Sequence, residues 1–78
     1  MLDLKEVLCG IARAIVDNPD EVTVTSAEDD DTVTLTLNVA ADDMGLVIGR
    51  HGRIAKAIRT VMKAAASTVS KKVNVEIR

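Results

Sequence analysis

The chain has 78 residues, of which 47% are hydrophobic; this fits one small domain covering residues 1–78 and excludes wholesale disorder. It contains no Phe, Trp or Tyr, so the core is aliphatic and any nucleic-acid binding proceeds without aromatic stacking. The single cysteine excludes an intramolecular disulfide and a cysteine-based metal cluster. No run approaches the length of about 18 apolar residues that crosses a membrane, and no signal peptide is evident, so we expect a cytoplasmic protein with no membrane partner.

The net charge of −2 hides an uneven distribution of charged residues. Residues 1–45 contain eleven acidic and two basic residues, a net charge of −9, whereas residues 46–78 contain eight basic and one acidic residue, a net charge of +7. Such asymmetry between two halves indicates one face that binds a polyanion. Random clustering of charges is the alternative.

The N-terminal region predicts an amphipathic helix over residues 2–17, because apolar residues recur there at the three-to-four spacing of one helix face. Asp3 is a suitable N-cap residue. Pro19 lacks the amide hydrogen that a continuing helix needs, so the helix ends before it. Cys9 is interpreted as a small core residue of this helix rather than a nucleophile.

Two segments that follow alternate apolar residues with threonines, which predicts half-buried strands over residues 22–26 and 32–39. The acidic link 28–31 is short, so the strands should form an antiparallel hairpin. We interpret the link as a solvated turn, because it lacks the oxygen spacing and the glycine of a calcium loop. Asp42 and Asp43 are expected to shape the turn after the hairpin.

The second half predicts a short helical segment near residues 44–48, a long helix over residues 53–70 and a last strand over residues 72–78. The predicted buried face of the long helix consists of Ile54, Ile58, Val61, Met62, Ala65 and Val69. The fold class is therefore α+β in the order α-β-β-α-α-β. Its three-stranded sheet should have the helices packed on one face, since each strand has only one apolar face.

The loop before the long helix reads Gly49-Arg50-His51-Gly52. Glycine permits backbone angles closed to other residues and removes the side chain that would keep a phosphate from the backbone. The second glycine also opens a helix, whose free N–H groups and positive end favour anions. No Gly-Lys pair is present, which excludes a P-loop. A plain link between two helices, with an exposed tip, is the alternative.

The segment from Val47 to Ile54, Val-Ile-Gly-Arg-His-Gly-Arg-Ile, closely resembles the signature of KH domains. The element order looks like the type II arrangement, and the whole chain is similar to the bacterial KhpA family; a departure is His51, where many KH loops carry Lys, Arg or Gly. The resemblance implies binding of single-stranded RNA, with about four nucleotides of backbone held by the loop. The RNA-binding residues it implies are Gly49, Arg50, His51, Gly52, Arg53, Lys56, Ile48 and Ile54, with the strand around residues 37–39 forming or backing the groove.

The resemblance also implies an RNA chaperone or post-transcriptional regulator. Its implied partner is a second, KhpB-like KH protein (also called Jag or EloR), and a homodimer is implied as well. The implied cellular role is in cell elongation, division, cell shape and cell wall biogenesis. We expect no enzyme, no metal and no cofactor, because His51 lacks a cysteine neighbour and an evident orienting carboxylate. Two alternatives stay open: a dimerisation module with a vestigial loop, and a single-stranded DNA binder.

Overall fold

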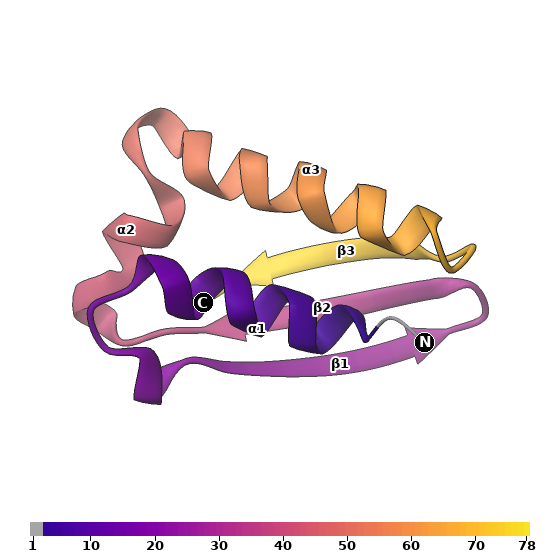
Figure 1. The fold of residues 1–78 in the computed structure, drawn as a ribbon, viewed down its shortest axis with the longest axis horizontal. Helices are drawn as coiled ribbons and strands as arrows, with labels where there is room; N and C mark the ends of the chain where they lie inside the picture. Colours follow the sequence, from indigo (N-terminus) through magenta and orange to yellow (C-terminus); the bar gives the residue numbers. More distant parts are fainter. Residues whose placement is uncertain (1–2) are drawn as a thin grey trace.

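The computed structural model describes residues 3–78 and contains a three-stranded sheet with the helices on one of its faces (Figure 1). The elements are α1 (Leu4–Ile15), β1 (Thr23–Asp29), β2 (Thr32–Asn38), α2 (Met44–Ile48), α3 (Arg53–Ser67) and β3 (Lys72–Ile77), with three 3₁₀ turns, η1 (Pro19–Glu21), η2 (Ala41–Asp43) and η3 (Arg50–Gly52). β2 is the central strand, antiparallel to β1 and parallel to β3. The predicted α+β class and the order α-β-β-α-α-β are confirmed.

Helix α1 begins after Asp3, whose carboxylate accepts hydrogen bonds from the amides of Lys5 at 3.0 Å and Glu6 at 3.4 Å. These bonds satisfy amides that have no partner within the helix. The helix ends two residues before the predicted end, because Val16 has an extended backbone with ψ of 161°. The predicted start at residue 2 lies outside the described residues. Within residues 3–78, no helix is both long and apolar enough to cross a membrane.

The β1–β2 hairpin has a tighter turn than the sequence predicts. Asp29 pairs with Thr32, so only Asp30 and Asp31 form the turn, and Asp30 has a positive φ of 50°. Strand β1 therefore extends three residues beyond its predicted end at residue 26. The alternation of side chains cannot reveal this extension, because Ala27 to Asp29 are all exposed and only their pairing with β2 makes them a strand.

The core lies between the helices and the inner face of β2, where Val33, Leu35 and Leu37 are buried. The predicted buried face of α3 is wrong at two positions: Ile54 is 38% exposed and Val61 is 49% exposed. The buried residues of α3 are Ala55, Ile58, Met62 and Ala66. They follow the same helical spacing on a face rotated from the predicted one, and the alanines at both ends let the helix approach the sheet.

A buried carboxylate joins the end of α1 to the start of α2. Asp43 is 1% exposed and accepts hydrogen bonds from the amide of Asp17 at 3.3 Å, the amide of Asn18 at 3.0 Å and the side-chain nitrogen of Asn18 at 3.1 Å. Every polar atom that a buried side chain of residues 3–78 contributes has a partner. The turn role expected for Asp43 thus includes a long-range one: it holds the α1–η1 connection against the helix that precedes the glycine loop.

Candidate nucleic-acid interface

The glycine loop lies at one end of the molecule, next to α2, and the β1–β2 turn lies at the opposite end (Figure 1). Gly49 ends α2, and its amide donates to the carbonyl of Gly45 at 2.9 Å. The chain then reverses within one turn, closed by a hydrogen bond from the amide of Gly52 to the carbonyl of Gly49 at 3.2 Å. Three of the four loop residues have positive φ: Gly49 at 75°, His51 at 57° and Gly52 at 72°.

The two glycines are required for different reasons. Gly49 has φ of 75° and ψ of 174°, a region that is essentially reserved for glycine. A Cβ atom there would also lie 2.8 Å from Cβ and 3.0 Å from the backbone nitrogen of Ile54. Gly52 has φ of 72° and ψ of 15°, the left-handed helical region, and a Cβ atom there would meet nothing within 4 Å. Gly49 therefore packs the turn against α3, whereas Gly52 faces open space.

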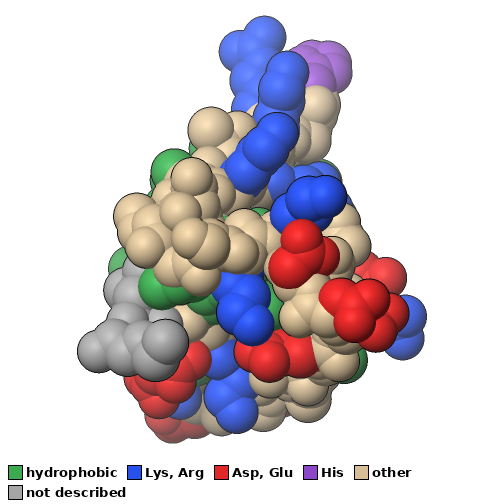
Figure 2. All heavy atoms as spheres, turned by 90° about the vertical axis from the view of Figure 1, so that its right-hand side faces the viewer, with side chains coloured by type: hydrophobic (Ala, Val, Ile, Leu, Met, Phe, Trp, Pro, Cys, Tyr) green, Lys and Arg blue, Asp and Glu red, His purple; other side chains and the backbone are tan. Residues whose placement is uncertain are grey.

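The N-terminus of α3 opens into that space. No side chain caps it, so the positive end of the helix dipole stays available to an anion, while the amide of Arg53 already donates to the carbonyl of Arg50. Arg50, His51 and Arg53 are all exposed around the turn. In the face shown in Figure 2, some Lys and Arg side chains lie at the top of the view near the histidine, and others lie lower among the Asp and Glu side chains. Arg50 and Arg53 thus place two positive charges beside the loop.

Aliphatic side chains flank the turn. Leu46, Ile48 and Ile54 are 38–40% exposed, although large apolar side chains are usually buried. Leu37 is fully buried, so its side chain can only back this surface, whereas Asn38 and Val39 are partly exposed. The predicted site residues Ile48 to Ile54 are therefore close together in the structure, with Lys56 two residues further along α3.

The comparison with protein families decides what this chain is related to. The model of the KhpA/KhpB KH domain matches residues 5–77. The chain belongs to this family. Relatives named RNA-binding protein KhpA are 54% identical in Clostridium acetobutylicum and 45% identical in Listeria monocytogenes; each match covers 95% of this chain and at least 97% of the relative.

Solved structures show the same fold in a larger protein. Era in complex with a segment of 16S ribosomal RNA matches with a TM-score of 0.69 at 15% identity, over 95% of this chain and 28% of the Era chain. Era of Aquifex aeolicus, bound to GDP and aluminium fluoride, matches with a TM-score of 0.62 at 17% identity, over 99% of this chain and 31% of its own. At these identities the likeness shows a shared fold alone.

The structure of this KH domain adds a contact that the sequence did not indicate. Nε of Arg59 on α3 donates a hydrogen bond of 3.2 Å to the carbonyl of Val75 on β3. β3 pairs with β2 on one side only, and the amides of Lys72 and Arg78 point to that side, where they bond to carbonyls 2.8 Å away. In a parallel strand, the backbone amide and carbonyl groups of successive residues point alternately to the two sides of the strand. The carbonyl of Val75 therefore points to the unpaired edge of β3. Arg59 therefore joins one flank of α3 to the free edge of β3.

This flank carries more positive charge than the predicted site included. Lys56, Arg59 and Lys63 follow one another at the three-to-four spacing of a helix face, and α3 contains no acidic residue. From sequence alone, these cations are indistinguishable from an ordinary solvated helix surface. The signal that could have found them is their shared spacing, which becomes informative only once Arg59 shows that the flank borders β3.

Proposed function

We propose that this KH domain binds single-stranded RNA at the surface formed by the glycine loop and the start of α3. The observation that carries the proposal is the turn itself. Gly52 leaves open space in front of an uncapped helix N-terminus, and Arg50, His51 and Arg53 surround that space. Backbone amides, a helix dipole and cations directed at one open site are the means by which proteins hold phosphate groups. The relatives named RNA-binding protein KhpA support the same reading.

The loop holds the phosphates in this proposal. The amides of Arg50 and His51, unlike those of Gly49 and Gly52, donate to no carbonyl within residues 3–78 and act as donors together with the side chains of Arg50, Arg53 and Lys56. His51 adds a charge when it is protonated. Ile48 and Ile54 supply an aliphatic surface beside the loop for the bases. Aliphatic contact replaces the aromatic stacking that this chain cannot provide, so one domain should bind about four nucleotides with an affinity in the micromolar range or weaker.

The test is a double substitution at the tip, Arg50→Asp with His51→Asp. Both side chains are exposed, so the fold should survive, and far-UV circular dichroism checks this. Binding of a labelled single-stranded RNA should be abolished. The matched control is Lys5→Asp with Arg13→Asp, which adds similar negative charge to exposed positions of α1 and should bind more tightly than the loop variant. A folded loop variant with undiminished RNA affinity would contradict the proposed site.

Purification gives a simple first readout of the same proposal. Since the chain has no Trp or Tyr, it absorbs little at 280 nm, and RNA that copurifies with it dominates the spectrum near 260 nm. Competition between RNA and DNA strands of one sequence then tests the single-stranded DNA alternative, because only the 2′-hydroxyl differs. A preference for DNA would replace RNA as the ligand while leaving the site in place.

A second surface favours association with another KH domain. Ala57, Val61 and Ala64 are exposed on α3 and recur at the spacing of a coiled-coil seam, on a different side from the cationic flank. We propose that this seam pairs two copies of the chain or one copy with a KhpB-like partner, which would raise the effective concentration of weak RNA sites. The Val61→Glu variant should be monomeric in sedimentation at concentrations where the wild type self-associates. An unchanged oligomeric state would exclude the seam.

The biological role that we propose is the one that the family resemblance implies. A weak, sequence-tolerant RNA site that gains affinity by pairing suits an RNA chaperone or post-transcriptional regulator that acts with a second KH protein in cell elongation, division and cell wall biogenesis. Crosslinking the protein to RNA in cells, with the loop variant as control, identifies the bound transcripts. If the wild type pairs through α3 but recovers no more RNA than the loop variant, the domain is a dimerisation module whose loop is vestigial.

A further inference from the structure

Strand β1 has one edge without a partner strand. The sheet order is β1-β2-β3, so β1 pairs with β2 alone, and no other segment within residues 3–78 pairs with it. Figure 1 shows this edge at the far side of the sheet from β3 and α3. In an antiparallel ladder, only alternate residues exchange hydrogen bonds with the neighbouring strand. About half of the seven residues of β1 therefore direct an N–H and a carbonyl group outward, where a further strand can pair with them.

The two edges of the sheet are protected to different degrees. Natural sheets block their edges with lysines, prolines, bulges or covering groups, because an open edge recruits other strands. On β3, the side chain of Arg59 donates to the outward carbonyl of Val75, and the strand begins with a lysine. Strand β1 contains no Lys and no Pro, and its one-to-one pairing with β2 contains no bulge. Six of its seven residues are exposed, so this edge is long, regular and open.

Negative charge is the protecting feature that β1 does have. The sequence contains no Lys, Arg or His from residue 14 to residue 49. Acidic side chains lie at both ends of the strand: Asp20 and Glu21 belong to η1 before it, and residues 28–31 form its end and the hairpin turn. All six are exposed. The edge therefore combines open backbone groups with a negative potential at each end.

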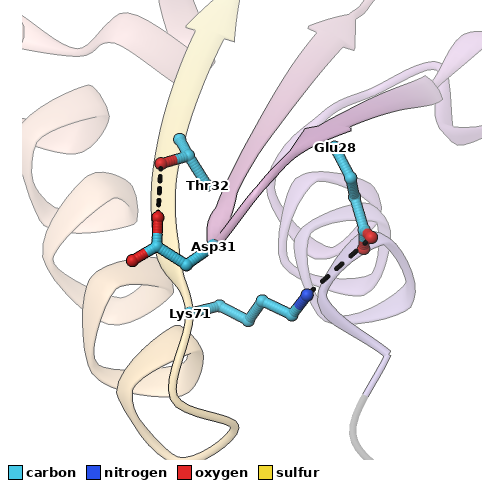
Figure 3. Close-up of polar contacts among 4 residues, drawn as sticks. All are labelled: Glu28, Asp31, Thr32 and Lys71. Carbon is cyan, nitrogen blue, oxygen red and sulfur yellow. Dashed lines mark hydrogen bonds and ion pairs between the residues drawn. The ribbon is translucent and has the colours of Figure 1, made fainter.

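The chain itself neutralises little of this charge. Glu28 forms an ion pair with Lys71 at 3.8 Å, and the carboxylate of Asp31 accepts a hydrogen bond from the hydroxyl of Thr32 at 3.4 Å (Figure 3). The other four acidic side chains at the two ends of β1 form no ion pair within residues 3–78. They are therefore available to a cationic partner.

A second copy of this chain is a poor partner for the edge. If two β1 strands paired in parallel, Glu28 and Asp29 of one copy would lie beside the same residues of the other. If they paired antiparallel over their full length, the acidic end of each strand would lie beside the acidic η1 turn of the other copy. Like charges that face each other across two strands are destabilising. The charges thus disfavour self-pairing and favour a strand that carries positive charge.

We propose that the free edge of β1 binds an extended, Lys- or Arg-containing segment of another protein, which adds a fourth strand to the sheet. Backbone hydrogen bonds to β1 hold the segment, and its cations lie beside the carboxylates at the two ends of the strand. A paired length of seven residues spans about 20 Å, so two cations about six residues apart reach both ends. The inference does not depend on RNA binding and adds a protein ligand to the domain.

The first experiment selects peptides on the folded full chain. The probe is a library of random peptides of about seven residues, the length of β1. Enriched peptides should contain Lys or Arg and few acidic residues, and about 1 M salt should weaken their binding, since it screens exposed charges. Failure to enrich any peptide over a bare support, or enrichment of acidic or uncharged peptides, would overturn the inference.

The second experiment tests strand pairing without changing the protein. The best peptide is synthesised in two versions, each with N-methyl groups on one of its two sets of alternate backbone amides. An added strand turns one set toward β1 and the other set toward solvent. One version should therefore bind at least about tenfold more weakly than the unmodified peptide, because its hydrogen bonds to β1 are lost, and the other should retain its affinity. Equal affinities of the two versions would mean charge attraction without strand pairing and would overturn the inference.

The third experiment tests the charges of the edge with the variant Glu21→Gln, Asp29→Asn. The matched control is Glu6→Gln with Glu76→Gln, which removes the same charge from exposed positions of α1 and β3. Far-UV circular dichroism checks that both variants fold. An exposed ion pair changes affinity by up to about fivefold, so the edge variant should bind the peptide about twofold to 25-fold more weakly than the wild type. The control should stay within about twofold of the wild type. Equal affinities of the two variants would exclude β1 as the binding edge.

Discussion

Replacing Gly49 by alanine tests the central geometric claim about the loop. A methyl group at this position meets two obstacles. The backbone angles, φ 75° and ψ 174°, belong to a region that residues with a Cβ atom avoid, and the new atom would lie 2.8 Å from Cβ of Ile54. Gly52 has a positive φ as well, but open space surrounds its position. Alanine substitutions at the two glycines therefore separate the cost of backbone strain, which both share, from the cost of a steric clash, which only Gly49→Ala has.

The expected destabilisation follows from these two terms. Strained angles cost about 1–3 kcal/mol, and forcing an extra methyl group into a packed position costs about 1–3 kcal/mol more, so Gly49→Ala should lower the free energy of unfolding by about 2–6 kcal/mol. Gly52→Ala requires only a left-handed conformation, which costs about 1–2 kcal/mol. Asparagine adopts that conformation more readily, so Gly52→Asn should cost less than Gly52→Ala. A domain of this length has a total of about 4–12 kcal/mol.

Urea unfolding followed by far-UV circular dichroism measures all three variants, since the chain has no aromatic residue to report by fluorescence. The predicted order of stability is wild type, Gly52→Asn, Gly52→Ala and then Gly49→Ala. If Gly49→Ala and Gly52→Ala had equal free energies of unfolding, the close approach to Ile54 would not destabilise the fold. The steric role assigned to Gly49 would then be wrong. An RNA titration of the two Gly52 variants then shows whether a side chain in the open space blocks the ligand.

Three further predictions concern stability and binding. Asp43→Ala should cost about 2–4 kcal/mol of unfolding free energy in the same urea assay, because three hydrogen bonds to a buried carboxylate are lost, whereas the exposed neighbour Asp42→Ala should cost less than about 0.5 kcal/mol; equal costs would contradict the structural role of Asp43. RNA binding should tighten as the pH falls from about 8 to about 6, since a nearby phosphate favours the protonated imidazole, and His51→Lys should flatten that dependence; a wild-type affinity that ignores pH would remove His51 from the phosphate contacts. For a strand of about four nucleotides, the slope of log K against log salt should be about −1.5 to −3, which corresponds to two to four phosphates; a slope near −6 for that strand would show that the loop site is larger than proposed.

Local sequence patterns were sufficient for the elements of this domain and for the core of the candidate site. Alternation over β2 and helical spacing over α1 and α3 report which backbone conformation buries apolar side chains, and these periods depend on near neighbours alone. The short helix at Met44–Ile48 and the glycine loop were also predictable from local sequence. Gly49 and Gly52 mark backbone angles that other residues avoid, and these angles end the short helix and form the loop.

The faces of α3 required the tertiary structure. Its sequence contains enough apolar residues for more than one buried stripe, so periodicity could not choose between a face with Ile54 and Val61 and a face with Ala55 and Ala66. Packing against the sheet selected the smaller residues, and this left Ile54 beside the loop and Val61 on an exposed seam. The same choice brought Arg59 to the edge of β3, with Lys56 and Lys63 on the same flank of the helix.

Long-range contacts were equally beyond the sequence. Asp43 bonds residues 25 and 26 positions earlier in the chain, and no local pattern distinguishes it from the exposed Asp42. Lys63 and Lys72 meet at one pocket because the parallel pairing of β2 with β3 returns the chain alongside α3. The sequence alone therefore determined the elements and the loop, since both depend on the conformations of neighbouring residues. Which side chains are buried, exposed or brought together depends on the packing of distant segments, and only the tertiary structure decided it.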